Sequence, residues 1–394
     1  MDERAYRLTS IDMLRGLVIV IMAIDHTRDY FSISLSIDPM NAATLNVPLA
    51  FTRWITHFCA PVFVFLAGTS VGLMAARKSP TELRSFLVAR GLWLIFVEVA
   101  VISTLLTFAP GGIEQLGGRT LVFMQVIWAI GASMVLLAFV QFLGRTTCLM
   151  FGLLIVLGHN AVDSFWPVSR NLFDASPPLW AALHVPMSKP MGPFHFIFLY
   201  PLVPWLGVMF LGFGASLLFE REPQARNRAL LRWGLGTTAF FIVLRSIDGY
   251  GEPNHWQVQA SGAATLVDFL NTTKYPPSLE FLAMRLGPAA ILCAFADRMH
   301  GFLKDALVMF GRVPFAFYVP HFLLLHLLAL ALGVIQGVPV GKLMTHPGFF
   351  PSGYGLPLLG VYGVWLLVVV LLYPFCRWVA AVKAHSRAWW LSYV

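Results

Sequence analysis

Charged residues are scarce in this chain of 394 residues: they make up 12% of it, whereas 58% of the residues are hydrophobic. A soluble domain is typically about a quarter charged. The composition therefore excludes an ordinary soluble protein and predicts an integral membrane protein. No soluble linker separates the apolar runs, so we expect a single transmembrane domain over residues 1–394.

Paired cysteines and the motifs of several enzyme classes are also missing. The four cysteines stand singly in apolar segments, which excludes a zinc site or a disulfide framework. The sequence has no Walker loop, no G-x-G-x-x-G after a strand and no H-E-x-x-H, so ATPase, dinucleotide and metal chemistry are not expected. The formal charge of +8 is dispersed over short loops, which indicates membrane topology and not a nucleic-acid partner.

Long apolar runs are what the chain has instead, and a helix needs about 20 such residues to span a bilayer. Ten segments qualify: residues 11–31, 53–76, 85–108, 120–142, 146–165, 195–219, 229–247, 278–297, 306–334 and 356–377. The sequence thus predicts an all-α polytopic bundle of about ten helices. Most Lys and Arg residues fall on the side that holds both termini, so the positive-inside rule places both termini in the cytoplasm.

The first predicted helix, in "RLTSIDMLRGLVIVIMAIDHTRDYF", carries unusual charge for a membrane span. At 100° per residue, Asp12, Arg15, His26 and Asp29 share one face, with Arg15 about 16 Å from His26 along the axis. Asp29 is one turn from His26 and could orient the imidazole as a general base. The alternative is that the charges form a solvated helix end. Arg28 falls on another face, where we expect it at the surface.

Further polar residues lie at or near membrane depth, where they often mark a functional path. His57 in the second helix either lines the same cavity as His26 or bonds a backbone carbonyl. Arg84 and Arg90, in the third helix, suit the phosphates of a nucleotide-like donor. Second-rank candidates are Gln125 for cofactor binding and, for substrate binding, Asp25, Lys274, Tyr275 and His321.

Gly68 and Gly72 are spaced as a pair of close-packing residues in the second predicted helix. Such a pair fits equally well between two helices of one chain and at the interface of a homodimer.

Six segments carry a family resemblance: "IDMLRGLVIVIMAIDHTRDYF", "FTRWITHFCAPVFVFLAGTS", "PWLGVMFLGFG", "FLNTTKYPPSLEFLAMRLGPA", "GRVPFAFYVPHF" and "WWLSYV". Over nearly the whole chain the sequence resembles the bacterial DUF1624 proteins. These are similar to the catalytic domain of heparan-alpha-glucosaminide N-acetyltransferase, within the transmembrane acyltransferase superfamily. The resemblance to the lysosomal enzyme rests on fewer residues, around "SIDMLRG", Pro61–Gly68 and "YVPH".

The resemblance implies a multi-pass acetyltransferase of the bacterial inner membrane. It would move an acetyl group from cytosolic acetyl-CoA to a sugar or glycan hydroxyl or amine on the far side. His26 resembles the catalytic histidine of the acyltransferase-3 branch, and Arg84 and Arg90 resemble its acyl-CoA residues. The lysosomal enzyme has Asn at the position of His26, and its catalytic histidine lies in the next loop, where this chain has Asp38 and Asn41.

The expected catalytic residues are therefore His26, Asp29, His57 and Arg15, with acetyl transfer either direct or through an acetyl-histidine. O-acetylation and N-acetylation both remain open, and so does the acceptor. A secondary transporter that uses the Arg15–His26 face as a proton path is the alternative. A non-catalytic membrane subunit that binds a partner through the outer loops is a third reading.

Overall fold

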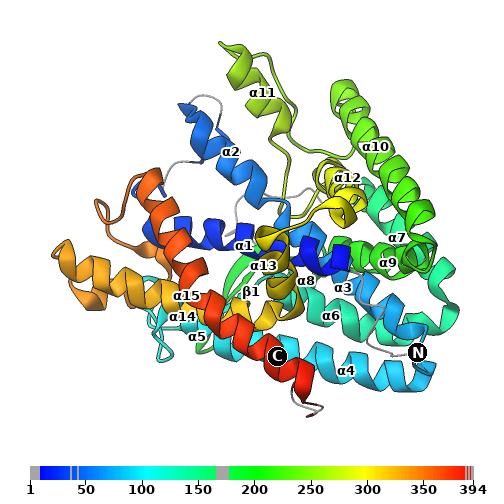
Figure 1. Cartoon of the computed structure of the whole chain (residues 1–394). Coiled ribbons are helices and arrows are strands. Elements are labelled where there is room, and N and C mark those ends of the chain that lie inside the picture. Colours follow the sequence, from blue (N-terminus) through cyan, green and yellow to red (C-terminus); the bar gives the residue numbers. More distant parts are fainter. Residues whose placement is uncertain are drawn as a thin grey trace.

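A computed structural model describes residues 9–35, 38–41, 44–165, 177–386, 388 and 391. Figure 1 shows a bundle of helices with one small sheet. The longer helices are α1 (Thr9–Phe31), α3 (Cys59–Ala75), α4 (Pro80–Phe96), α6 (Val126–Val140), α7 (Arg145–Gly158), α9 (Leu202–Phe219), α10 (Pro223–Ile247), α12 (Leu279–Phe295), α13 (Phe302–Arg312), α14 (Pro314–Ile335) and α15 (Leu358–His385). The shorter ones are α2 (Val47–Thr56), α5 (Ser103–Thr107), α8 (Pro178–Leu183) and α11 (Gly262–Leu270).

Nine helical stretches of the described residues are long and apolar enough to cross a membrane. Each matches one of ten predicted spans, which confirms the all-α polytopic fold. The tenth, α1, is long enough but carries Asp12, Arg15 and Asp25 along its length. The chain ends, which we expected in the cytoplasm, lie largely outside the described residues.

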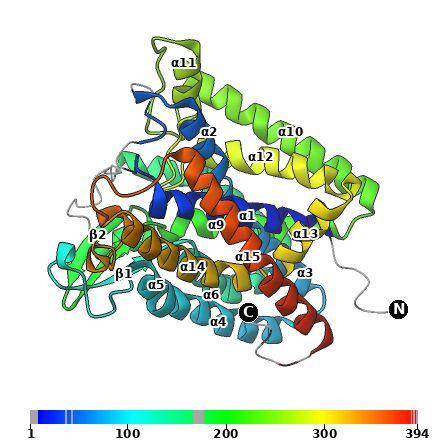
Figure 2. The same cartoon turned by 60° about the vertical axis from the view of Figure 1, so that its left-hand side comes forward.

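Helix α1 is enclosed by other helices, as two views of the bundle show (Figures 1 and 2). It packs against α2, α3, α12, α13, α14 and α15. Charged side chains are tolerated at membrane depth when they face protein and find partners there. The enclosure of α1 therefore explains how a helix with this charge fits in a membrane protein.

Two predicted spans, 120–142 and 195–219, begin with strands and not with helix. β1 (Thr120–Met124) pairs in parallel with β3 (Phe194–Phe198), and β2 (Met187–Met191) pairs with β3 antiparallel, giving the order β1-β3-β2. In a sequence, a short apolar run such as these cannot be assigned to a strand or to a buried helix by its periodicity alone. The sheet joins the loops that precede α6 and α9.

Prolines divide two further predicted spans. The segment 306–334 is two helices, because Pro314 disfavours helical backbone at Val313, which has φ −132° and ψ 51°. The span 53–76 is divided into α2 and α3 at His57 and Phe58. Pro61 has no N–H to bond the carbonyl of His57, four residues earlier. His57 thus lies at a break between helices.

Glycines allow the closest helix crossings. A Cβ on Gly16 would overlap the carbonyl oxygen of Leu307, and one on Gly311 would overlap the carbonyl oxygen of Asp12, so α1 and α13 meet backbone to backbone. Gly68 likewise faces the Met209 carbonyl and Gly72 faces Ser216, both on α9. The pair predicted to pack closely therefore does so within the chain.

The crossing of α1 and α13 gives a stability prediction. Gly311→Val places methyl groups where the Asp12 carbonyl lies, so the two helices must separate. Overpacking of this kind typically costs about 1–3 kcal/mol. We expect a clear fall in the melting temperature of the purified protein in detergent. Gly236→Val is the control, because open space surrounds Gly236 on α10, and equal melting temperatures for the two variants would contradict the backbone contact.

Candidate active site

Two histidines from distant parts of the chain meet near the C-terminal end of α1. Nδ1 of His26 on α1 lies 2.7 Å from Nε2 of His321 on α14. Their rings are stacked, with centroids 5.0 Å apart, and Phe322 covers the His26 ring at 4.5 Å. His321 is fully buried and His26 is partly buried. A hydrogen-bonded imidazole pair in such a site can accept and hold a proton.

The hydrogen bonds of the pair determine which nitrogen is basic. Nδ1 of His321 is hydrogen-bonded to the carbonyl oxygen of Tyr318, which can only accept, so this nitrogen carries the proton. In the neutral ring Nε2 of His321 is then the acceptor, and His26 Nδ1–H donates to it. The lone pair of His26 therefore lies on Nε2. His26 is held in the tautomer that a general base requires.

Asp29 does not take the orienting role that its spacing suggested. Its carboxylate accepts a hydrogen bond from Arg28 at 3.0 Å, and its side chain is 40% exposed. His321 occupies the Nδ1 side of His26 instead. Asp29 still acts electrostatically on His26.

Arg28 was expected at the surface and is buried. Its guanidinium lies 3.0 Å from Asp29 and 3.5 Å from Asp25. Helical periodicity gives the direction in which a side chain leaves α1, but not which neighbouring helix covers that face. Because α1 is surrounded, this direction leads into protein.

Asp25 forms the strongest ion pair of the site. Both of its oxygens accept hydrogen bonds from Nη1 of Arg53 on α2, at 2.5 and 2.6 Å. Arg53 is not among the residues predicted from the sequence. Its place in an apolar segment, one turn before His57, is the signal that could have indicated it. The pair joins α2 to the charged end of α1.

His57 lies beside Arg285, a second arginine that was not predicted from the sequence. Nη2 of Arg285 on α12 is 3.4 Å from Nδ1 of His57, and Nη1 donates to Thr272 Oγ1 at 2.8 Å. The Arg285 guanidinium stacks over Phe281 at 4.4 Å. Arg285 is fully buried, and His57 is 6% exposed. His57 and His26 share the electrostatic influence of Asp25, Arg53 and Lys274.

Lys274 and Tyr275 lie in the same region, at the end of the loop that precedes α12. The Lys274 ammonium lies 5.1 Å from the Tyr275 ring centroid and 5.9 Å from that of Tyr200. Burial raises the pKa of the Tyr200 hydroxyl well above its usual value, so this ring stays neutral. The predicted substrate-binding residues Asp25, Lys274 and Tyr275 thus gather around His26 and His57.

Arg15 lies at the opposite end of α1 and connects three helices. It donates to Asp12 and to the Gly311 carbonyl, each at 3.0 Å, and to Ser70 Oγ at 2.7 Å. Ile19 and Met22, which follow on the same face of α1, are buried. The structure therefore does not bring Arg15 together with His26.

The three predicted cofactor residues are spread along α4 and α6. Arg84 is exposed near the start of α4, and Arg90 lies over the Phe315 ring at 5.7 Å. Gln125 precedes α6 next to Glu98, whose carboxylate accepts a hydrogen bond from the Trp128 N–H. Fourteen residues of helix separate Arg84 from Glu98, which is about 20 Å. Gln125 is therefore remote from Arg84.

The fold and the site together define a polytopic helical membrane protein with a buried histidine pair among cationic side chains. The family model of the heparan-alpha-glucosaminide N-acetyltransferase catalytic domain matches residues 7–245, and the chain belongs to this family. A search of curated proteins gives no match. The matched residues include His26, Arg53 and His57, whereas Lys274, Arg285 and His321 lie beyond them.

The ion pair of Asp25 and Arg53 gives a second stability prediction. Arg53→Gln leaves the carboxylate, whose side chain is 13% exposed, with the longer contact to Arg28 as its one ion pair among the described residues. Breaking a buried pair in this way costs about 3–5 kcal/mol, so we expect a large fall in melting temperature. Adding Asp25→Asn should recover part of the loss, since no charge is then left unpaired. A double variant less stable than Arg53→Gln would contradict this pairing.

Proposed function

We propose that this protein is an acetyl-CoA-dependent O- or N-acetyltransferase that modifies a sugar or glycan. Membership of the acetyltransferase family supports the class of reaction. The observation that carries the proposal is the hydrogen-bond chain from Tyr318 through His321 to His26, which leaves the lone pair on Nε2 of His26. A base of this kind is what attack on a thioester by a hydroxyl or amine needs.

In the direct route, His26 Nε2 takes the proton of the acceptor hydroxyl or amine while that atom bonds to the thioester carbonyl carbon. The tetrahedral intermediate then expels the CoA thiolate. His26 returns its proton to the thiolate sulfur, so the products are the acetylated acceptor and CoA. The charge of the transient imidazolium is stabilised by its hydrogen bond to His321 and by the carboxylates of Asp25 and Asp29.

In the covalent route, Nε2 of His26 attacks the thioester carbon and CoA leaves as the thiolate. The acceptor then attacks the acetyl group on the imidazole, and the acceptor proton goes to CoA or to solvent. The same lone pair serves both routes, so His26 has the central role in each. His57 would assist on the acceptor side, where it lies close to Lys274 and Arg285.

The proposed donor path starts at the cytoplasmic face, with both chain termini on that side of a bacterial inner membrane. On the side of the bundle that is expected to face the cytoplasm, Arg145 pairs with Glu220 and Arg226 pairs with Asp297. These ion pairs connect helix ends and loops. CoA phosphates would bind near Arg84 and Arg90. Arg15 and Asp12 would hold the inner end of α1, about 16 Å from His26.

A transporter with a proton path along α1 is less well supported. Ile19 and Met22 lie between Arg15 and His26 on that face, with exposed fractions of 1% and 6%. Packed apolar side chains carry no proton and leave no room for a chain of water molecules.

The first functional prediction concerns His26. His26→Ala should lower the rate of CoA release from labelled acetyl-CoA with amino-sugar acceptors by about 10²–10⁴-fold, because the base or nucleophile is gone. His300→Ala is the control, since His300 is an exposed histidine. If purified wild-type protein neither binds acetyl-CoA nor releases CoA, the enzyme proposal is wrong.

A second functional prediction tests whether His321 positions His26 for catalysis or only stabilises the fold. His321→Ala removes the acceptor for His26 Nδ1–H, so kcat should fall by on the order of 10²-fold while the KM for acetyl-CoA changes little. His321→Gln can offer a carbonyl oxygen to the same N–H and should restore part of kcat. Equal losses for Ala and Gln, or a change in KM alone, would contradict the positioning role.

A further inference from the structure

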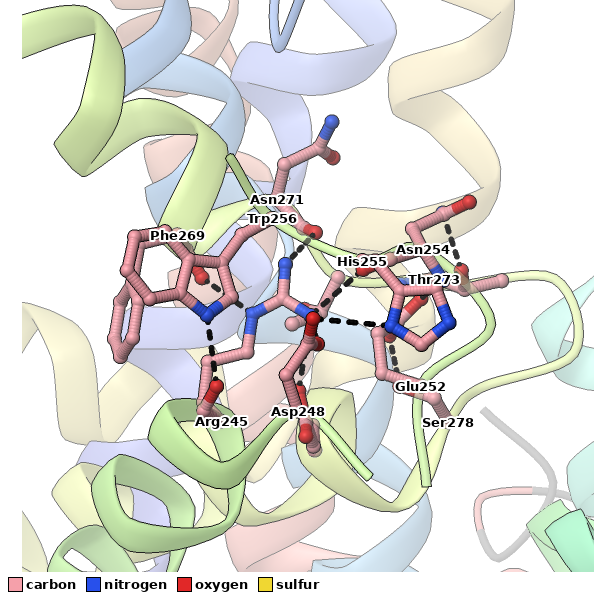
Figure 3. Close-up of polar contacts among 12 residues, drawn as sticks. Arg245, Asp248, Glu252, Asn254, His255, Trp256, Phe269, Asn271, Thr273 and Ser278 are labelled. Atoms are coloured by element: carbon pink, nitrogen blue, oxygen red, sulfur yellow. Dashed lines mark hydrogen bonds and ion pairs between the residues drawn. The ribbon is translucent and has the colours of Figure 1, made fainter. Parts of the chain in front are cut away.

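Lys274 lies in a turn that is clamped at both ends. Glu252 accepts hydrogen bonds from the Thr273 N–H at 2.8 Å and its hydroxyl at 2.5 Å, just before the turn, and from the Ser278 hydroxyl at 2.6 Å, just after it. Figure 3 shows Glu252 beside these two residues. A carboxylate that holds both ends of a short segment fixes the direction in which Lys274 leaves the chain.

The loop that carries Glu252 is itself fixed by Arg245 of α10. This fully buried guanidinium donates to the carbonyl oxygens of Asn254, Asp268, Phe269 and Asn271, at 2.8–3.2 Å (Figure 3). It also lies 3.3 Å from Glu280 at the start of α12. Lys274 is therefore presented by a rigid support and not by a free loop.

Lys274 is a buried residue, and no carboxylate of the described residues forms an ion pair with its ammonium. The residue is 91% buried, since its exposed fraction is 9%. Within the part of the chain that the structure describes, the ammonium makes no ion pair or hydrogen bond, and its contacts are the rings of Tyr200 and Tyr275. Ring faces attract a cation but do not neutralise its charge.

Arg285 and His57 leave further donors unused beside it. Arg285 is fully buried, and the partners of its Nη atoms, Thr272 and His57, are both neutral. Because His57 Nδ1 accepts from Arg285, its proton lies on Nε2. Neither His57 Nε2 nor Arg285 Nε has a hydrogen-bond partner among the described residues.

The nearby carboxylates are already engaged. Asp25 is held by Arg53 and Arg28. Glu252 accepts hydrogen bonds from Thr273 and Ser278 and attracts Arg285 only through space. The region therefore has two cationic side chains, Lys274 and Arg285, that form no ion pair with a carboxylate of the described residues. A bound anion could pair with these cations at close range, which a buried charge favours. Ionisable groups in this setting usually mark a substrate path.

We propose that Lys274, with Arg285 and His57, forms a subsite for an anionic group of the acceptor, such as a carboxylate, sulfate or phosphate. This inference rests on the proposed acetyl transfer. The subsite lies around the end of α1 that holds Asp25 and His26, whereas the expected donor phosphates lie towards the Arg15 end. The acceptor, and not CoA, is therefore the source of the anion.

The experiment compares two acceptors that differ by one charged group, D-glucosamine and D-glucosamine 6-sulfate. For wild-type protein we expect kcat/KM to be at least tenfold higher with the sulfated sugar. Lys274→Gln should bring the ratio of the two kcat/KM values close to one, whereas Lys274→Arg should keep most of the preference. Lys342→Gln, at an exposed lysine, is the matched control.

Binding without acetyl-CoA gives a readout that does not depend on catalysis. Glucosamine 6-sulfate should bind wild type at least tenfold more tightly than Lys274→Gln in calorimetry, and Lys274→Arg should resemble wild type. Equal binding of both sugars by wild type would overturn the subsite, even if acetyl transfer is found. Charge-selective binding without any acetyl transfer would overturn the proposed function and leave the subsite standing.

Two kinetic outcomes would also overturn the assignment. If Lys274→Gln lowers kcat equally with both sugars, Lys274 acts at the reacting carbonyl and not on an acceptor anion. If it raises the KM for acetyl-CoA and leaves that for the sugar unchanged, the anion belongs to the donor.

Discussion

Charge inside a membrane protein has to be enclosed and paired, and the arrangement of this bundle follows from that constraint. Helix α1 carries more charge than any other candidate span, and six helices surround it. Arg15 is satisfied by Asp12, Ser70 and a backbone carbonyl, while Asp25 is satisfied by Arg53. The close glycine crossing with α13 brings the Gly311 carbonyl within reach of Arg15.

The same constraint applies to Lys274 and Arg285, which form no ion pair with a carboxylate of the described residues. Lys274 and Arg285 are as deeply buried as the paired residues. The loops near them are held by the hydrogen bonds of Glu252 and Arg245. Lys274 leaves a turn that is held at both ends, so its Cα cannot move towards water. This placement supports the proposed subsite over a poorly packed part of the fold as the reason for the two cations.

The sequence predicted the spans well because each needs only about 20 apolar residues in a row. It also placed His26 on the inward face of α1, because periodicity along one helix is local information. It could not name the partner of His26, since His321 lies 295 positions away and only the packing of α1 against α14 brings them together. Asp29, one turn away on the same helix, was the nearest residue that could be predicted to orient His26. The strands at 120–124 and 194–198 were missed because short apolar runs have no distinctive period.

The site joins two parts of the chain that differ in their relation to the family. Helices α1 and α2 supply His26 and Arg53 from the matched residues, whereas His321, Lys274 and Arg285 come from beyond residue 245. Neither part holds the histidine pair alone, so its geometry depends on how α14 docks on α1. The cations of the proposed subsite come mainly from the second part. In the proposed mechanism, the second part of the chain therefore sets the acceptor preference and α1 supplies the base.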